Sequence, residues 1–184
     1  EEFFDYSPNM TDGDIGRRII PGGDLHSKYI RFLDKIADFC EACIDVYGDR
    51  IPMIFRPFHE CNGDWFWWGK THLEDDKFVT LYQFTIDYLR YDRGIRSLLF
   101  AFSPNGEIYD KKTYLSRYPG DDYVDILGLD FYDDKPRSEK DFHELLQESL
   151  DVVFECAYER GKIMALTEVG LRMMNTAPDG KFYE

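Results

Sequence analysis

The apolar positions of this chain alternate between two patterns, one typical of helices and one typical of buried strands. Helical spacing predicts four helices, at 25–47, 78–93, 111–117 and 141–160. Uninterrupted apolar runs predict four strands, at 51–58, 97–103, 124–132 and 162–166. Turn-forming residues predict a loop from 171 onward and a loop at 1–23 with room for a short ordered piece. The alternation of helices and strands predicts a parallel sheet covered by helices.

Several polar residues mark where the predicted helices begin and end. Asp24 is the expected N-cap of the first helix, and Gly48 is expected to stop it. Ser138 and Asp141 have the spacing of a capping box before the last helix. No internal repeat or linker interrupts this series, so we expect one domain over residues 1–184.

The strand at 51–58 runs into an unusual polar and aromatic segment. Arg56, His59 and Glu60 are followed by three tryptophans within four residues, beginning at Trp65. A carboxylic acid can protonate a leaving oxygen, and indoles offer flat apolar faces to sugar rings, so the combination suggests carbohydrate chemistry. The alternative is that His59 and Glu60 are ordinary polar groups at a strand end and that the tryptophans belong to the core. The whole run beside Arg-x-x-His-Glu favours the functional interpretation.

The segment RPFHECNGDWFWWG resembles the signature of glycoside hydrolase family 26, the retaining β-mannanases and their relatives. The resemblance implies that Glu60 is the general acid/base, that His59 is the site histidine beside it, and that Trp65 is a platform for a sugar ring. Retaining glycosidases need a second carboxyl group near the first. Glu168, in the TEVG that follows the last predicted strand, fits the family's nucleophile position. A lone glutamate at a strand end is otherwise more often an ion-pair partner.

Further residues near the strand ends complete the expected site. The resemblance implies that Tyr132 hydrogen-bonds the nucleophile and that Asp130 supports the site; the alternative is a core tyrosine with a capping aspartate. Arg56 is expected to hold the carboxylates in register. Asn105 lies on the loop after the second strand and is expected to line the groove.

The resemblance also implies a (β/α)8 TIM barrel, an α/β fold that normally has eight strands. Only about four strands are visible here, so the chain is expected to cover about strands 4–7, a partial barrel. A half-barrel of this kind would expose apolar sheet edges and inner faces.

Composition narrows the choice of partners. A net charge of −14 argues against nucleic acid and anionic membrane surfaces, which attract basic proteins. No apolar run reaches 18 residues, so no membrane insertion is expected. The four cysteines lack the spacing of a disulfide framework or a zinc site. No signal peptide is visible in the chain, and the resemblance implies a secreted, periplasmic or cell-surface protein.

The sequence therefore predicts a retaining, endo-acting glycoside hydrolase that cleaves β-1,4-mannosidic bonds in mannan, glucomannan or galactomannan, with no metal or organic cofactor. Two alternatives stay open. One is a β-1,3-xylanase or mixed-linkage β-glucanase of the same family, and the other is a non-catalytic carbohydrate-binding relative. The sequence leaves the oligomeric state undetermined.

Overall fold

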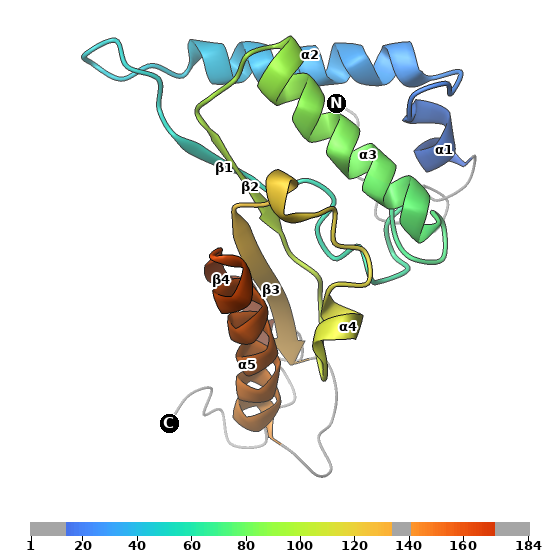
Figure 1. Cartoon of the computed structure of the whole chain (residues 1–184), viewed down its shortest axis with the longest axis vertical. Coiled ribbons are helices and arrows are strands. Elements are labelled where there is room, and N and C mark those ends of the chain that lie inside the picture. The colour runs from blue at the N-terminus through green and yellow to red at the C-terminus, as the bar shows by residue number, and fades with distance from the viewer. Residues whose placement is uncertain (1–13, 134–140, 172–184) are drawn as a thin grey trace.

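A computed structural model of the chain describes residues 14–133 and 141–171, which form four strands and seven helical segments (Figure 1). In chain order these are α1 (Ile15–Ile19), α2 (His26–Ala42), β1 (Met53–Phe55), α3 (Asp75–Asp87), the π-helix η2 (Tyr88–Asp92), β2 (Leu98–Phe102), α4 (Lys111–Tyr114), the 3₁₀ helix η3 (Asp121–Tyr123), β3 (Ile126–Asp133), α5 (Phe142–Arg160) and β4 (Ile163–Leu171).

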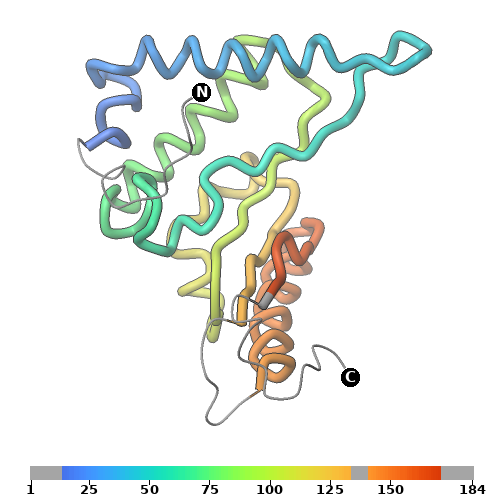
Figure 2. Tube along the Cα trace, turned by 180° about the vertical axis from the view of Figure 1, so that it is seen from behind, coloured from blue at the N-terminus to red at the C-terminus, as the bar shows by residue number. Residues whose placement is uncertain are grey.

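The four strands form one parallel sheet in the order β1-β2-β3-β4, which is also their order along the chain. The sheet curls into a half-barrel. Helix α5 packs against both β3 and β4. Figures 1 and 2 show α2 and α5 at opposite ends of the molecule with the sheet between them. The predicted parallel sheet with covering helices is confirmed.

Strand β3 shows how the sheet divides the core from the site. Leu127, Leu129 and Phe131 are almost completely buried in the core that the sheet forms with the helices. Because side chains alternate along a strand, Asp130 and Tyr132 point to the opposite face. The site is built on that inner face of the curl.

The inner face of the sheet also carries apolar side chains that solvent reaches. Ile54 of β1 and its register partner Leu99 of β2 are 64% and 41% exposed. Both alternate with residues that pack against the helix-side core. This is the exposure that the sequence predicts for a half-barrel.

The first long helix differs from its prediction at both ends. Asp24 does not cap it: its carboxylate accepts hydrogen bonds from Arg18, and the N-cap position belongs to Leu25. The helix ends at Ala42 instead of continuing to residue 47. The carboxylate of Asp45 accepts the backbone N–H groups at positions 47 and 49, and this local turn replaces the helical hydrogen bonds.

The loop predicted at 1–23 left room for a short ordered piece, and the short helix α1 is such a piece. Other boundaries depart from the predictions. Strand β1 stops at Phe55, three residues before the predicted end. The capping box before α5 is formed by Asp141 and Glu144; Ser138, which the sequence assigned to it, lies outside the described residues.

All four cysteines are free thiols, and Cys40, Cys61 and Cys156 are buried. Within the described ranges, no helix has both the length and the apolar character needed to cross a membrane.

Candidate active site

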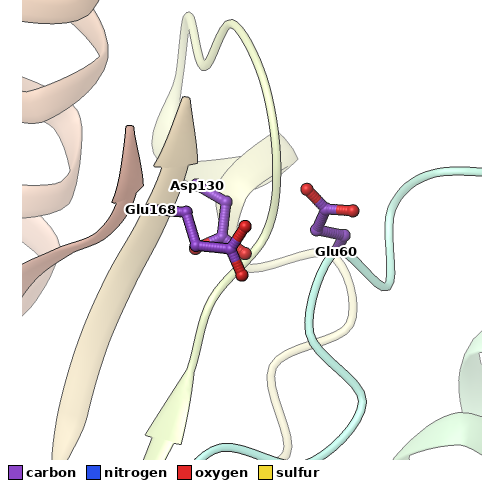
Figure 3. A group of neighbouring side chains, drawn as sticks. All are labelled: Glu60, Asp130 and Glu168. Atoms are coloured by element: carbon purple, nitrogen blue, oxygen red, sulfur yellow. The ribbon is translucent and has the colours of Figure 1, made fainter. Parts of the chain in front are cut away.

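Three carboxylates from distant parts of the sequence meet at the carboxyl ends of the strands (Figure 3). Asp130 lies on β3, Glu168 on β4, and Glu60 on the loop that follows β1. One side-chain oxygen from each lies within 4.8 Å of the others. In parallel α/β sheets this end of the strands is where sites are built.

An irregular backbone brings Glu60 into this group. Phe58 has φ +54° and Glu60 has φ +51°, a left-handed conformation that is uncommon for residues other than glycine. The backbone N–H of Glu60 donates to the carbonyl of Ser103 at 2.8 Å, which ties the loop to the end of β2. Glu60 is only 5% exposed. Strained backbone of this kind persists where the surrounding structure holds it and is frequent at functional sites.

Both oxygens of Glu60 accept hydrogen bonds from neutral N–H donors. The indole Nε1 of Trp65 donates to Oε2 at 2.6 Å, and the amide Nδ2 of Asn105 donates to Oε1 at 2.5 Å. Asn105 is held in turn by Asn62, whose side chain exchanges two hydrogen bonds with the backbone of Asn105, at 2.6 and 2.8 Å. The orientation of the Glu60 carboxylate therefore depends on two loops.

A β-bulge in β4 turns Glu168 toward the site. Leu129 of β3 pairs with Leu166, but Asp130 pairs with Glu168, so Thr167 is an extra residue in the ladder. Without the bulge, Glu168 would lie beside the next residue of β3, which points into the core. With the bulge, both Thr167 and Glu168 lie beside Asp130. Thr167 Oγ1 donates to Asp130 Oδ1 at 2.6 Å, and Glu168 and Asp130 form ion pairs with the same cation.

Arg56 is that shared cation. Its Nη1 donates to Asp130 Oδ2 at 2.7 Å and to Ser103 Oγ at 3.0 Å, and its Nη2 donates to Glu168 Oε1. Tyr132 OH donates to Glu168 Oε2 at 2.8 Å. The guanidinium thus contacts two of the three carboxylates at once.

These contacts set the charge states of the site. Burial raises the pKa of Glu168, but the hydrogen bonds from Arg56 and Tyr132 and the positive charge of Arg56 outweigh it, so the pKa lies below its ordinary value. Burial dominates for Asp130 and raises its pKa to about 6, although Thr167 and Arg56 act in the opposite direction. Burial, followed by the charge of Arg56, lowers the pKa of His59.

The aromatic residues of the loop fall into two groups. The rings of Phe66 and Trp68 are stacked at a centroid distance of 4.3 Å, and the ring of His59 lies 4.9 Å from Phe66. Trp67 and Trp68 pack against the core, whereas Trp65 is 41% exposed. Trp65 is therefore the tryptophan with ring surface free to meet a ligand.

The structure brings seven of the eight residues expected in the site into two adjoining hydrogen-bonded groups, and the eighth, His59, lies on the same loop as Glu60. One group is Glu60, Trp65 and Asn105, and the other is Arg56, Asp130, Glu168 and Tyr132. Ser103 contacts both groups, because its hydroxyl accepts from Arg56 and its carbonyl accepts from the backbone N–H of Glu60. Sequence reasoning missed Asn62 and Thr167, which act on other site residues. Thr167 directly precedes Glu168 in TEVG, but no spacing rule indicates that its hydroxyl reaches Asp130.

The three carboxylates are close enough to hold a metal ion together, and the described residues contain no second such group of His, Cys, Asp and Glu. Arg56 already supplies a positive charge to two of them. We therefore assign them to no metal.

A parallel half-barrel with two glutamates at its carboxyl edge, one of them beside an exposed indole, is typical of the barrel-type glycoside hydrolases. The chain belongs to glycosyl hydrolase family 26, whose family model matches residues 8–176. A mannan endo-1,4-beta-mannosidase of Bifidobacterium adolescentis is 40% identical over 159 residues, which are 85% of this chain and 16% of that protein.

Two solved structures resemble the half-barrel closely. GH26C from a Muricauda species gives a TM-score of 0.84 at 40% identity, over 90% of this chain and 44% of that chain. A modular endo-beta-1,4-mannanase of Cellulomonas fimi gives a TM-score of 0.84 at 40% identity, over 88% of this chain and 36% of that chain. The chain thus spans less than half the length of each of these relatives.

Proposed function

We propose that this chain carries the catalytic pair of a retaining glycoside hydrolase acting on β-1,4-mannosidic bonds in mannan, glucomannan or galactomannan. The observation that carries the proposal is the closeness of Glu60 and Glu168, whose nearest carboxylate oxygens lie within 4.8 Å. Retaining enzymes hold the two carboxyl groups roughly 5–5.5 Å apart, whereas inverting enzymes leave about 6.5–9.5 Å for a water molecule. The mannanase names of the relatives support the choice of mannan.

In this proposal the contacts of each glutamate determine its role. Glu168 is ionised because Arg56 and Tyr132 stabilise its charge, so it attacks the anomeric carbon as nucleophile. Glu60 has uncharged hydrogen-bond partners, Trp65 and Asn105, and protonates the glycosidic oxygen. Glu60 then removes a proton from water, which attacks the glycosyl-enzyme and releases a sugar with retained configuration.

The remaining residues of the site bind the sugar or hold the catalytic groups in place. Asp130 is completely buried, so it holds Arg56 in place and does not meet the substrate. The exposed indole of Trp65 offers a flat apolar face to a pyranose ring, and His59 lies beside Glu60 on the same loop. The chemistry needs no metal or organic cofactor.

The proposal extends to the whole protein. The chain corresponds to about strands 4–7 of a (β/α)8 barrel, and residues 1–184 belong to a single catalytic domain. We place the protein outside the cytoplasm, as a secreted, periplasmic or cell-surface enzyme, because its substrate is a polysaccharide.

The substrate is tested by measuring sugar release from glucomannan, xylan and lichenan in parallel. Release from glucomannan alone is the expected result. Release from β-1,3-xylan or from lichenan would identify one of the alternative activities within the family. Binding to these polymers without any release would favour a non-catalytic carbohydrate-binding protein.

The mechanism is tested by replacing each glutamate with alanine. We expect Glu168→Ala to abolish hydrolysis of every substrate, because a good leaving group does not replace a missing nucleophile. Glu60→Ala should lower activity on mannan by roughly 10²–10⁴-fold but spare glycosylation by an activated aryl mannoside, whose leaving group needs no proton. Glu159→Ala, which removes an exposed glutamate of α5, is the matched control.

Azide separates the two roles directly. Added to Glu60→Ala, it should restore turnover and yield a β-glycosyl azide, because a small anion attacks the covalent intermediate without a general base. An α-glycosyl azide from Glu60→Ala together with a β-glycosyl azide from Glu168→Ala would show that the two assignments are exchanged, because azide that takes the place of the nucleophile inverts the configuration in a single displacement. Unchanged activity in both variants would refute the site.

A further inference from the structure

Two glycines beside the catalytic pair are not explained by backbone conformation. Gly63 lies in the loop that carries Glu60, and Gly170 lies two residues after Glu168 on β4. Neither is among the described glycines with positive φ, so an alanine could adopt the backbone at either position. The reason for glycine must therefore be sought in the space around it.

At Gly63 that space is filled by the ring of Trp65. A Cβ atom added to Gly63 would lie 2.4–2.5 Å from three carbon atoms of the six-membered ring, Cη2, Cζ2 and Cζ3. Carbon atoms that are not bonded pack at about 3.5–4.0 Å, so ring and Cβ cannot both keep their places. The same indole donates its N–H to Glu60.

At Gly170 the space is filled by the ring of Tyr132. Gly170 and Tyr132 are register partners on β4 and β3. A Cβ atom at Gly170 would lie 2.9 Å from Cε1 and 3.2 Å from Cδ1 of the tyrosine. The same phenol donates its O–H to Glu168.

We propose that Gly63 and Gly170 are positioning residues of the catalytic pair, each leaving room for the aromatic ring that hydrogen-bonds one of the two glutamates. The kinetic part of this inference rests on the roles proposed for Glu60 and Glu168, whereas its structural part does not. The proposal assigns one glycine to each catalytic glutamate.

The two substitutions to alanine should therefore have different kinetic effects. Gly63→Ala displaces the donor to Glu60, so it should impair hydrolysis of mannan and spare the glycosylation step, measured as kcat/KM, with an activated dinitrophenyl mannoside. Gly170→Ala displaces the donor to Glu168, so it should slow both substrates equally. We expect each loss to be roughly 10- to 100-fold, as for one hydrogen bond to a charged group.

Double variants provide the matched controls. Trp65→Phe and Tyr132→Phe remove the donors themselves. If Gly63 acts through Trp65, then Gly63→Ala combined with Trp65→Phe should be no slower than the slower single variant. Gly63→Ala combined with Tyr132→Phe should show multiplied losses, because those two changes act on different glutamates.

An NMR measurement tests the contacts without relying on activity. The indole N–H signal of Trp65 is assigned by its loss in Trp65→Phe. In the otherwise unmodified protein this signal should shift on Glu60→Gln, and in Gly63→Ala it should no longer respond. Carboxyl ¹³C titration should give Glu168 a higher pKa in Gly170→Ala, as in Tyr132→Phe.

The outcomes separate two kinds of failure. If the unmodified protein hydrolyses none of the substrates, the proposed function fails. The NMR results alone then decide whether Gly63 and Gly170 position the two aromatic rings. If the Trp65 signal in Gly63→Ala still responds to Glu60→Gln, and the Glu168 titration in Gly170→Ala matches that of the unmodified protein, the glycine inference is overturned.

Folding of the variants has its own control. Trp65 is partly exposed, so its ring can swing away from an alanine at position 63. If Gly63→Ala nevertheless unfolds, adding Trp65→Ala should restore the melting temperature, because the shortened side chain removes the contact. A failure of that rescue would overturn the inference for Gly63.

Discussion

Arg56 is the cation between two carboxylates of the site, and we expect its replacement by methionine to destabilise the protein in a pH-dependent way. Methionine fills a similar volume but donates no hydrogen bond. The change leaves the carboxylate of Asp130, which is completely buried, with Thr167 as its remaining hydrogen-bond donor among the side chains described at the site. Removing one partner of a buried ion pair costs about 3–5 kcal/mol in stability.

The pKa of Asp130 gives the size and sign of the pH dependence. In the native protein burial raises this pKa from 3.8 to about 6, which corresponds to about 3 kcal/mol of penalty on ionisation. A carboxyl group whose folded pKa is raised stabilises fully below its unfolded pKa, and this stabilisation is lost as pH rises through the folded pKa. Without Arg56 the folded pKa rises further, so the loss continues to higher pH.

The free energy of unfolding, measured by urea denaturation at pH 5 and pH 8, tests this reasoning. Arg56→Met should lose about 3–5 kcal/mol at pH 8 and clearly less at pH 5, where Asp130 is protonated in both proteins. Adding Asp130→Asn should recover much of the loss at pH 8 and little at pH 5. Arg18→Met, which removes a surface ion pair with Asp24, should change stability by no more than about 1 kcal/mol.

Two results would contradict the argument. The first is an equal loss of stability for Arg56→Met at both pH values. The second is a double variant with Asp130→Asn that is no more stable at pH 8 than Arg56→Met. Either would mean that the buried charge of Asp130 is not the source of the cost.

Two further predictions concern single side chains. Tyr132→Phe removes a hydrogen-bond donor to Glu168, so the pKa of that carboxyl group should rise. The acidic limb of the plot of kcat/KM against pH should then move to higher pH, and an unmoved limb would exclude Glu168 as its origin. Arg117 is buried and holds the loop after Glu60, because it donates to the carbonyls of Trp68 and Leu73 at 2.9 and 2.6 Å. Arg117→Lys should lower the free energy of unfolding, measured by urea denaturation, by about 3 kcal/mol. A decrease below about 1 kcal/mol would contradict this role.

The sequence was sufficient to predict the parts of the fold that depend on local patterns. All four strands overlap the predicted apolar runs, although β4 continues to Leu171, five residues past its predicted end, and α3 with η2, α4 and α5 correspond to three of the predicted helices. These elements are specified by periodicity that can be counted along the chain. The early end of α2 could not be predicted from this periodicity, because the side chain of Asp45 accepts backbone N–H groups in a local turn that replaces the helix.

The position of Glu168 shows where such counting fails. Strict alternation from Ala165 places Thr167 on the inner face and Glu168 on the outer face. The bulge reverses this for Glu168, and it depends on the pairing of β4 with β3. The sequence therefore indicated which glutamate to examine through its resemblance to a family pattern, and not through the geometry of the strand.

Arg117 shows a second limit. Its guanidinium donates to the carbonyls of Cys61, Trp68 and Leu73, all more than forty residues earlier in the chain. Carbonyl groups are present at every residue, so no residue type marks these partners. A buried arginine of this kind is visible only once the chain is folded.

The site holds three carboxylates but one arginine paired with them, Arg56, which contacts both Asp130 and Glu168. The charge state of one of these two carboxylates therefore affects the other. When Asp130 takes up a proton as pH falls below about 6, a negative charge beside Glu168 disappears. Arg56 then forms an ion pair with Glu168 alone, which favours the ionised form of Glu168. Under the proposed function, a buried residue that never meets the substrate thus helps the nucleophile to stay charged in mildly acidic solution. Because the two groups are coupled, the acidic limb of a pH profile reports Glu168 and Asp130 together, and a change at Glu168 alone, such as Tyr132→Phe, still moves it.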